Sequence, residues 1–173
     1  EYNEKYEDLF FLIEKTLIDR IGVDTAGKLH TGRSRNDMEH TMFRMELRKC
    51  IVLTIKDLFS LSEHLIKRSE KGTSEIILLY THGQPAQAST LAHFLSAVIE
   101  FCLRDIERLT KALDLVNMCP MGAAAITTSG FPLSRERMAK LLGFEKIVKN
   151  SYGAIASCDY ITTTYSALKI ASI

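Results

Sequence analysis

Apolar residues recur at helical spacing along most of this chain. From about Tyr6 to Ile21 they stand mainly three and four positions apart, which places them on one face of a helix, and Gly22 ends that helix. The stretch from about Asp37 to Ser69 keeps this spacing without Pro or Gly. It therefore predicts one long helix of the kind found in bundles, broken by the segment Lys71–Ser74.

A second long helix is predicted beyond a short apolar run, Ile76–Tyr80, which fits a buried extended segment but has no decisive periodicity. Pro85 suits the first turn of a helix, and the apolar positions from Leu91 continue at helical spacing to about Val116. Because the connection is short, the two long helices are expected to lie antiparallel as neighbours.

The last part of the chain predicts shorter helices. Ser134 is placed to cap a helix over Arg135–Leu142 that stops at Gly143, and a final helix is predicted from about Tyr152 to Ile173. Arg135 is expected to be solvated or paired with an acidic side chain such as Glu136. The pattern as a whole predicts an all-α protein built on a long-helix bundle.

Composition narrows the possible partners. The chain has 173 residues, with 22 basic and 21 acidic side chains and a net charge of +1, so no global field favours nucleic acid or an anionic membrane. It has neither an apolar stretch of membrane-spanning length nor a signal-peptide pattern. Four widely spaced cysteines are typical of reduced thiols in a cytoplasmic protein: Cys50, Cys102, Cys119 and Cys158.

The segment Gly27–Asp37, between two predicted helices, is the strongest candidate for binding an anion. Arg33 and Arg35 offer planar donors that match carboxylates, while Ser34, Asn36 and Asp37 stand where the free amides of a following helix begin. A solvated basic connection is the competing interpretation.

A second candidate is Thr81–His82, interpreted as the mouth of a helix. The imidazole of His82 is suited to proton transfer near neutral pH, and Thr81 and Gln84 provide groups to orient it or bind a ligand. A helix-capping histidine is the alternative.

The small residues of Met121–Gly130 fit either an anion pocket made of backbone amides or a close crossing between helices. The sequence shows no metal-ligand constellation, phosphate loop or dinucleotide fingerprint, so neither a metal nor a cofactor is predicted.

The chain resembles argininosuccinate lyase in three stretches that occur in that family's order: Gly27–Asp37, Thr81–Gln87 and Phe131–Phe144. Two shorter segments, Asn150–Ser151 and Asp159–Tyr160, share this resemblance. The second stretch is similar to the wider fumarase and aspartase superfamily. The resemblance implies a homotetramer whose active sites are built by several subunits. It also implies a cofactor-free β-elimination that releases arginine and fumarate from a small dicarboxylate substrate.

By motif position, the resemblance implies that Ser34, Arg35 and Asn36 contact substrate, that Thr81 binds substrate, and that His82 assists proton transfer. It also divides the chain. Residues 1–74 would hold the end of an amino-terminal region, the basic loop and the first long helix, and residues 75–173 the second long helix and those that follow.

Two features leave alternatives open. The superfamily's signature loop with its catalytic serine is not found in these residues, so the chain is expected to be an inactive fragment of the enzyme. Departures from the family pattern allow a paralogue acting on another fumarate-releasing substrate, and a non-catalytic helical oligomer is a further alternative; these departures are Met38, Ala88, Gly153 and Cys158.

Overall fold

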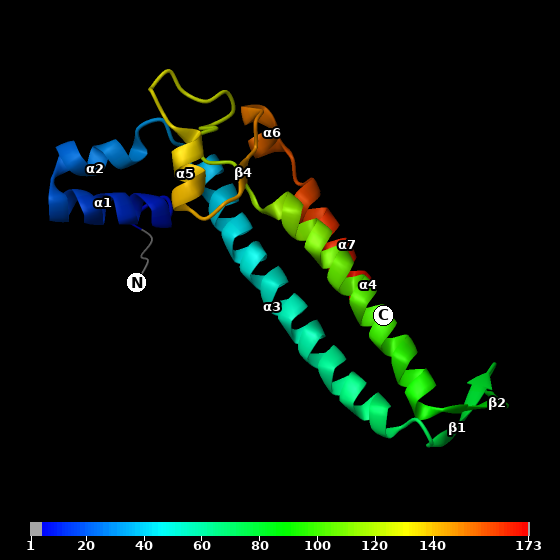
Figure 1. Ribbon diagram of the computed structural model, residues 1–173. Coiled ribbons are helices and arrows are strands. Elements are labelled where there is room, and N and C mark those ends of the chain that lie inside the picture. Colours follow the sequence, from blue (N-terminus) through cyan, green and yellow to red (C-terminus); the bar gives the residue numbers. More distant parts are fainter. Residues whose placement is uncertain (1–4, 173) are drawn as a thin grey trace. The chain divides into compact units, whose positions relative to one another are not determined.

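A computed structural model describes residues 5–172, most of which lie in helices (Figure 1), as the predicted all-α class requires. The chain divides into two compact units. The first comprises Glu1–Glu46 and Asn117–Ser157, and the second comprises Leu47–Val116 and Cys158–Ile173. Within the described range, no helix combines the length and the apolar character needed to cross a bilayer.

The first unit begins with two helices, α1 (Leu9–Ile21) and α2 (Val23–His30). The side chain of Asp8 caps α1 by accepting a hydrogen bond from the Phe11 amide at 3.2 Å. Gly22, with φ of 81°, ends α1 as predicted, because this backbone conformation is strained for residues with a side chain. α2 packs on α1 through His30, whose Nδ1 lies 2.9 Å from Glu14 Oε1.

The remainder of the first unit surrounds a small apolar core of Cys119, Ala139 and Phe144. Its elements are β3 (Met118–Cys119), α5 (Arg135–Leu141), β4 (Lys146–Ile147), parallel to β3, and α6 (Ser151–Ala156). As predicted, Ser134 caps α5, and Gly143 follows its end with φ of 70°.

Arg135 behaves differently from expectation. Its guanidinium donates hydrogen bonds to the carbonyl oxygens of Met121 at 3.2 Å, Val148 at 2.8 Å and Lys149 at 3.3 Å. This side chain therefore ties two loops of the first unit together. The expectation of a solvated or acid-paired arginine was wrong because sequence spacing gives no sign of carbonyl groups that approach from distant segments.

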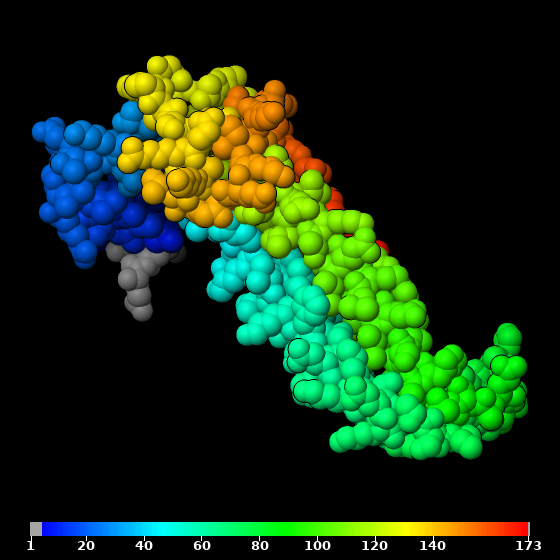
Figure 2. All heavy atoms as spheres, viewed as in Figure 1, coloured from blue at the N-terminus to red at the C-terminus, as the bar shows by residue number. Residues whose placement is uncertain are grey.

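The second unit is organised by long helices. Helix α3 (Arg35–Lys71) enters it at Leu47 and has 37 residues, and α4 (Leu91–Val116) has 26. Within this unit the two helices run antiparallel (Figure 1), and their side chains fill the space between the ribbons (Figure 2). Both long helices are therefore confirmed, although α4 begins at Leu91 and not near Pro85.

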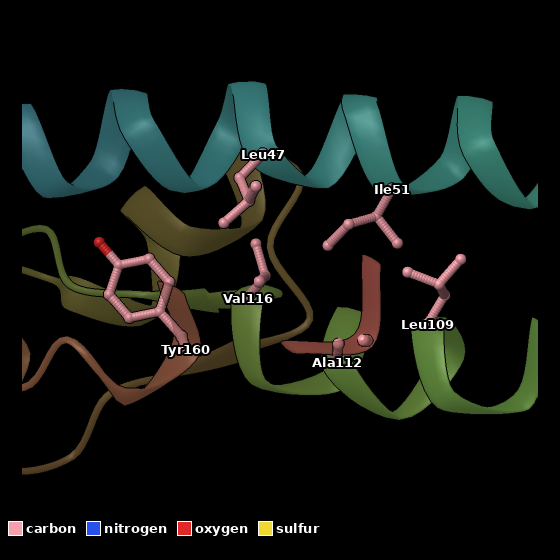
Figure 3. Close-up of a cluster of buried hydrophobic side chains, with 7 residues drawn as sticks. Leu47, Ile51, Leu109, Ala112, Val116 and Tyr160 are labelled. Carbon is pink, nitrogen blue, oxygen red and sulfur yellow. The ribbon is translucent and has the colours of Figure 1, made fainter. Parts of the chain in front are cut away.

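The core of the second unit joins three helices (Figure 3). Leu47 and Ile51 from α3 meet Leu109, Ala112 and Val116 from α4, and α7 (Asp159–Ala171) adds two more side chains, Tyr160 and Ala167. Leu109 and Val116 are fully buried. Removal of this apolar surface from water is the main favourable term holding the helices together.

The predicted final helix is interrupted. α6 ends at Ala156, Ser157 is extended with ψ of 125°, and α7 starts at Asp159. α7 forms despite its run of β-branched residues, because burial of Tyr160 in the core outweighs their lower helix propensity. The buried hydroxyl of Thr164 donates to the Tyr160 carbonyl at 2.8 Å, which satisfies it within the helix. The predicted end at Ile173 lies outside the described residues.

The connection between the long helices is a β-hairpin. β1 (Ile76–Thr81) pairs antiparallel with β2 (Gln84–Thr90), with a bulge between Leu79 and Tyr80. The extended run is confirmed, but it is not buried: Ile76 is 79% exposed and Tyr80 62%. Pro85 lies in β2, opposite Tyr80, so its predicted place in a helical first turn was wrong.

We expect Leu109→Ala to destabilise the second unit by about 2–5 kcal/mol, because it leaves a cavity in a fully buried position. Lys111→Ala, two positions further along α4 in an exposed ion pair with Glu107, is the matched control and should change stability by less than ~0.5 kcal/mol. Denaturant unfolding followed by circular dichroism measures both. Equal effects of the two substitutions would show that this core does not hold the helices.

Candidate functional site

The predicted basic loop is shorter in the structure than in the sequence pattern. Gly27 to His30 belong to α2, and only residues 31–34 connect it to α3. Gly32 adopts φ of 64°, and a Cβ there would come within 2.5 Å of the Leu133 side chain. The positive φ favours glycine at this turn, and a side chain there would also displace Leu133.

Ser34 stands at the amino end of α3. Its Oγ accepts a hydrogen bond from the Asn36 amide at 3.2 Å, and its own amide donates to Asp37 Oδ1 at 2.9 Å. This reciprocal arrangement satisfies donors that the first turn of a helix leaves free. It fixes the backbone of Ser34, Arg35 and Asn36, the three residues predicted to bind substrate in this unit.

The Asp37 carboxylate is fully buried and connects this turn to the small-residue segment. Its Oδ2 accepts hydrogen bonds from the amides of Gly122 at 2.9 Å and Ala124 at 3.0 Å. Ala124 has φ of 52° and Gly122 φ of 85°, conformations that turn their amides toward one acceptor. The backbone amides of this segment therefore bind the carboxylate of the protein's own Asp37.

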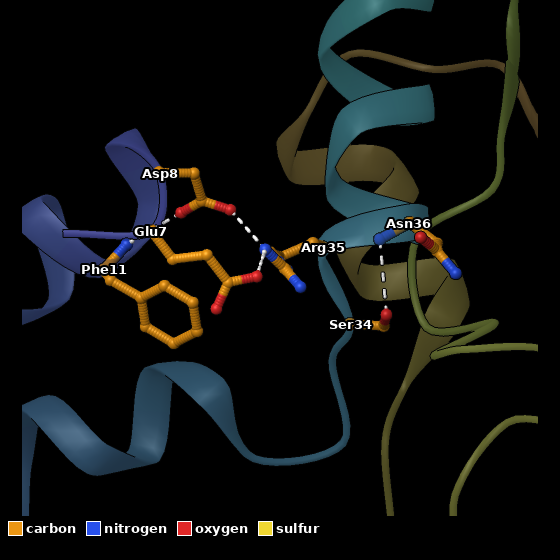
Figure 4. Close-up of polar contacts among 6 residues, drawn as sticks. All are labelled: Glu7, Asp8, Phe11, Ser34, Arg35 and Asn36. Carbon is orange, nitrogen blue, oxygen red and sulfur yellow. Dashed lines mark hydrogen bonds and ion pairs between the residues drawn. The ribbon is translucent and has the colours of Figure 1, made fainter. Parts of the chain in front are cut away.

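Arg35 reaches toward α1, away from Ser34 and Asn36 (Figure 4). Its Nη1 donates hydrogen bonds to Glu7 Oε1 at 3.0 Å and to Asp8 Oδ2 at 2.5 Å, and its guanidinium lies 5.3 Å from the centre of the Phe11 ring. The hydrogen bonds to Asp8 and Glu7 raise the pKa of Arg35, and the bond from Arg35 lowers the pKa of Asp8. The structure therefore places Arg35 in ion pairs with two acidic side chains of the same chain.

An open pocket of about 610 Å³ lies in the first unit, beside the start of α3. The turn contributes Gly32 to Arg35 to its wall, the facing loop contributes residues 124–129, and Phe11 and His30 complete it. Arg33 lines this pocket, and among the described residues its guanidinium has no hydrogen-bond or ion-pair partner.

Thr81, His82 and Gln84 lie in the second unit, at the tip of the hairpin. His82 and Gly83 form the two-residue turn with φ of 53° and 72°, so His82 does not stand at the mouth of a helix as predicted. All three predicted residues are exposed. Neither unit by itself brings Ser34, Arg35 and Asn36 together with Thr81, His82 and Gln84.

For two residues of the site, the sequence did not reveal the bonding partners. Asp8 was not recognised because it is one of several acidic residues before α1. Its position in the sequence does not indicate a partner 27 residues away. Asp37 was placed with Ser34 and Asn36 at the first free amides of the helix, but its bonds to the Gly122 and Ala124 amides were not foreseen. The pattern Ser34-x-x-Asp37 is a capping box, which predicts the bond to the Ser34 amide.

Nearly the whole chain is similar in sequence to known lyases. A family model described as "Lyase" matches residues 7–173. "Argininosuccinate lyase 2" of Agrobacterium fabrum is 53% identical over 169 residues, which are 98% of this chain and 34% of that protein. The argininosuccinate lyase of Methanosarcina acetivorans is 42% identical over 156 residues, 90% of this chain and 32% of that protein.

Solved structures of EDDS lyase are also similar to this chain. EDDS lyase in complex with formate superposes with a TM-score of 0.87 at 34% identity, over 90% of this chain and 31% of that one. A variant of EDDS lyase with bound fumarate gives a TM-score of 0.86, with the same identity and coverage. The chain spans about a third of the length of the relatives it matches.

We expect Asp37→Asn to destabilise the first unit by about 2–4 kcal/mol, because the amide NH₂ cannot accept the hydrogen bonds that Asp37 accepts from buried amides. Hydrogen exchange at the Gly122 and Ala124 amides should accelerate. Glu39→Gln removes a charge from the same region of α3 at an exposed position, and it should leave this exchange unchanged. Unaltered protection of both amides in Asp37→Asn would contradict the role given to this carboxylate.

The ion pair between Arg35 and Asp8 predicts a direction of pH dependence. Because the pKa of Asp8 is lowered in the folded protein, the pair's contribution is present above the usual value of 3.8 and is lost as the pH falls through the lowered pKa. Carbon-detected NMR titration should give an Asp8 midpoint below 3.8. In Arg35→Gln this midpoint should rise, and a midpoint that stays the same would exclude the pair.

Proposed function

Because this chain belongs to the lyase family, we propose that the whole protein is a carbon–nitrogen lyase that reversibly cleaves argininosuccinate to arginine and fumarate by β-elimination. The observation that carries this proposal is the similarity of nearly the whole chain to relatives named argininosuccinate lyase. The matched region includes the three stretches that suggested the same family from sequence.

The proposed chemistry needs fixed donors and a proton carrier. Removal of a proton from the carbon beside a carboxylate gives an aci-carboxylate, whose developing charge is stabilised by preorganised hydrogen-bond donors. Cleavage of the C–N bond then releases arginine and leaves fumarate. These steps require no metal or organic cofactor, and we propose none.

In this scheme Ser34 and Asn36 contact a substrate carboxylate from the amino end of α3, where the helix dipole also favours negative charge. Their rigid backbone, held by Asp37, supports this role. Arg35 is the third predicted contact, although its Nη1 is already engaged by Glu7 and Asp8.

Thr81 and Gln84 are proposed to bind substrate, and His82 to assist proton transfer. Their exposure at a hairpin tip supports contact with a ligand or another subunit, since no described side chain bonds the His82 imidazole. We therefore propose a homotetramer in which each active site combines residues of several subunits. The free cysteines, two of them exposed, support a cytoplasmic location.

A second candidate keeps the chemistry and changes the substrate. The solved neighbours are named EDDS lyase, one of them with bound fumarate, and the departures at Met38, Ala88, Gly153 and Cys158 are part of the matched region. Another adduct that releases fumarate is therefore the alternative substrate, and a non-catalytic helical oligomer is the alternative from a different class of protein.

We expect the full-length protein to produce fumarate from argininosuccinate, seen as rising ultraviolet absorbance, and His82→Asn to slow turnover by about 10²–10⁴-fold through loss of the proton carrier. His64→Asn is the matched control, because His64 bonds the Ser60 carbonyl of its own helix. Turnover in His82→Asn equal to that of the unmodified protein would exclude the role of His82.

Parallel assays with argininosuccinate and adenylosuccinate test the substrate. Fumarate release from argininosuccinate alone supports the primary proposal, and release from the other adduct supports the paralogue. Absence of fumarate from every adduct tested would favour the non-catalytic oligomer.

A further inference from the structure

The peptide group that joins Met121 to Gly122 is bonded at both of its polar atoms. Its carbonyl oxygen, from Met121, accepts a hydrogen bond from Arg135 Nε at 3.2 Å. Its N–H, from Gly122, donates to Asp37 Oδ2 at 2.9 Å. A cation on the carbonyl side and an anion on the amide side together fix the plane of this peptide, because turning the plane would break both bonds.

Arg135 is itself held on its other side. It is the first residue of α5, and its Nη2 and Nη1 donate to the carbonyls of Val148 at 2.8 Å and Lys149 at 3.3 Å. Three acceptors at three different nitrogens need the planar guanidinium with its five N–H donors, which the single ammonium of a lysine does not reproduce. The guanidinium therefore joins the residues that follow β4 to the Met121 carbonyl.

The side chain of Arg135 also packs directly on the backbone of Gly122. A Cβ at Gly122 would stand 2.8 Å from Arg135 Cγ and 2.8 Å from Met138 Cε. This contact blocks movement of the Gly122 backbone toward α5, and the hydrogen bond to the Met121 carbonyl opposes movement away from α5. Arg135 thus fixes both the position and the orientation of one peptide group.

The hydrogen bonds continue from this peptide to the turn that carries the predicted substrate contacts. Asp37 accepts from the Gly122 amide at Oδ2 and from the Ser34 amide at Oδ1, the latter at 2.9 Å. A peptide whose carbonyl is bonded to a cation is a stronger N–H donor, since hydrogen bonds in a chain polarise one another. Arg135 is therefore linked to Ser34 through that peptide and the Asp37 carboxylate.

We propose that Arg135 is a positioning residue for the lyase reaction, which fixes Ser34 through this chain of hydrogen bonds. Arg135 is not among the described residues that line the pocket beside Ser34, so it acts indirectly. The inference deepens the proposed function, on which it rests for the reaction and for the role of Ser34. All the groups that take part belong to the first unit.

The test uses the full-length protein and compares Arg135→Met with Arg135→Lys and Arg137→Met. Methionine keeps an aliphatic side chain against Gly122 and removes every donor, lysine keeps the charge, and Arg137 is an exposed arginine of the same helix. Hydrogen exchange at the Gly122 and Ser34 amides should accelerate in Arg135→Met by about 10- to 100-fold, as loss of a charge-assisted hydrogen bond implies. Arg135→Lys should give a smaller acceleration and Arg137→Met none.

The Phe144 amide is the internal reference for this measurement. It donates to the Ala139 carbonyl at 2.9 Å in the small apolar core of the same unit. If Arg135 only stabilised the unit as a whole, its loss would accelerate exchange at Phe144 as much as at Gly122 and Ser34. We expect the Phe144 amide to keep its protection in Arg135→Met.

Steady-state kinetics with argininosuccinate test the functional consequence. A displaced Ser34 binds the substrate less well, so KM should rise by about 10-fold in Arg135→Met while kcat changes little. A general loss of stability would instead leave fewer active molecules, which lowers the apparent kcat at unchanged KM. Arg135→Lys should show a smaller rise in KM, and it decides the question by the same comparison if Arg135→Met does not fold.

Unchanged KM in Arg135→Met would overturn the inference, as would unchanged exchange at Ser34 or an equal acceleration at Phe144. The proposed function fails separately. If the unmodified protein does not cleave argininosuccinate, the substrate assignment falls, and accelerated exchange at Ser34 still supports the positioning role. If the protein cleaves argininosuccinate and Arg135→Met does so with unchanged KM, the inference alone falls.

Discussion

The buried Asp37 carboxylate is the interaction on which the candidate site depends. It accepts hydrogen bonds from the amides of Ser34, Gly122 and Ala124, which come from segments more than eighty residues apart in the chain. A buried carboxylate is stable only when donors replace its lost water, so the turn before α3 and the small-residue loop must form together. The pocket between them is a consequence of this requirement.

Three arginines of the first unit differ in what their guanidinium groups contact. Arg35 is neutralised by Glu7 and Asp8, and Arg135 is used by three carbonyl groups, so both contribute to the structure. Arg33 alone among these three guanidiniums faces the pocket without a described partner.

The second unit is held together by an apolar core. The helices α3, α4 and α7 share one core, whereas Ile76, Leu78 and Tyr80 of the hairpin between α3 and α4 are exposed. At its base, Arg68 and Glu75 form a two-point ion pair at 2.9 and 2.7 Å, which links the last turn of α3 to the residue before β1. His82 thus lies in the turn of a hairpin whose base carries this ion pair.

The sequence by itself determined the long helices, the ends of the short helices α1 and α5, and the family. Apolar spacing over many turns, Gly22, Ser134 and Gly143 are local signals, and local geometry decides them. Only the tertiary structure decided that Pro85 lies in a strand, that the last helix breaks at Ser157, and that Arg35 is the arginine bonded to Glu7 and Asp8. These outcomes depend on contacts between distant segments, such as Arg35 with Asp8 and Asp37 with Gly122, which periodicity and motif spacing do not encode.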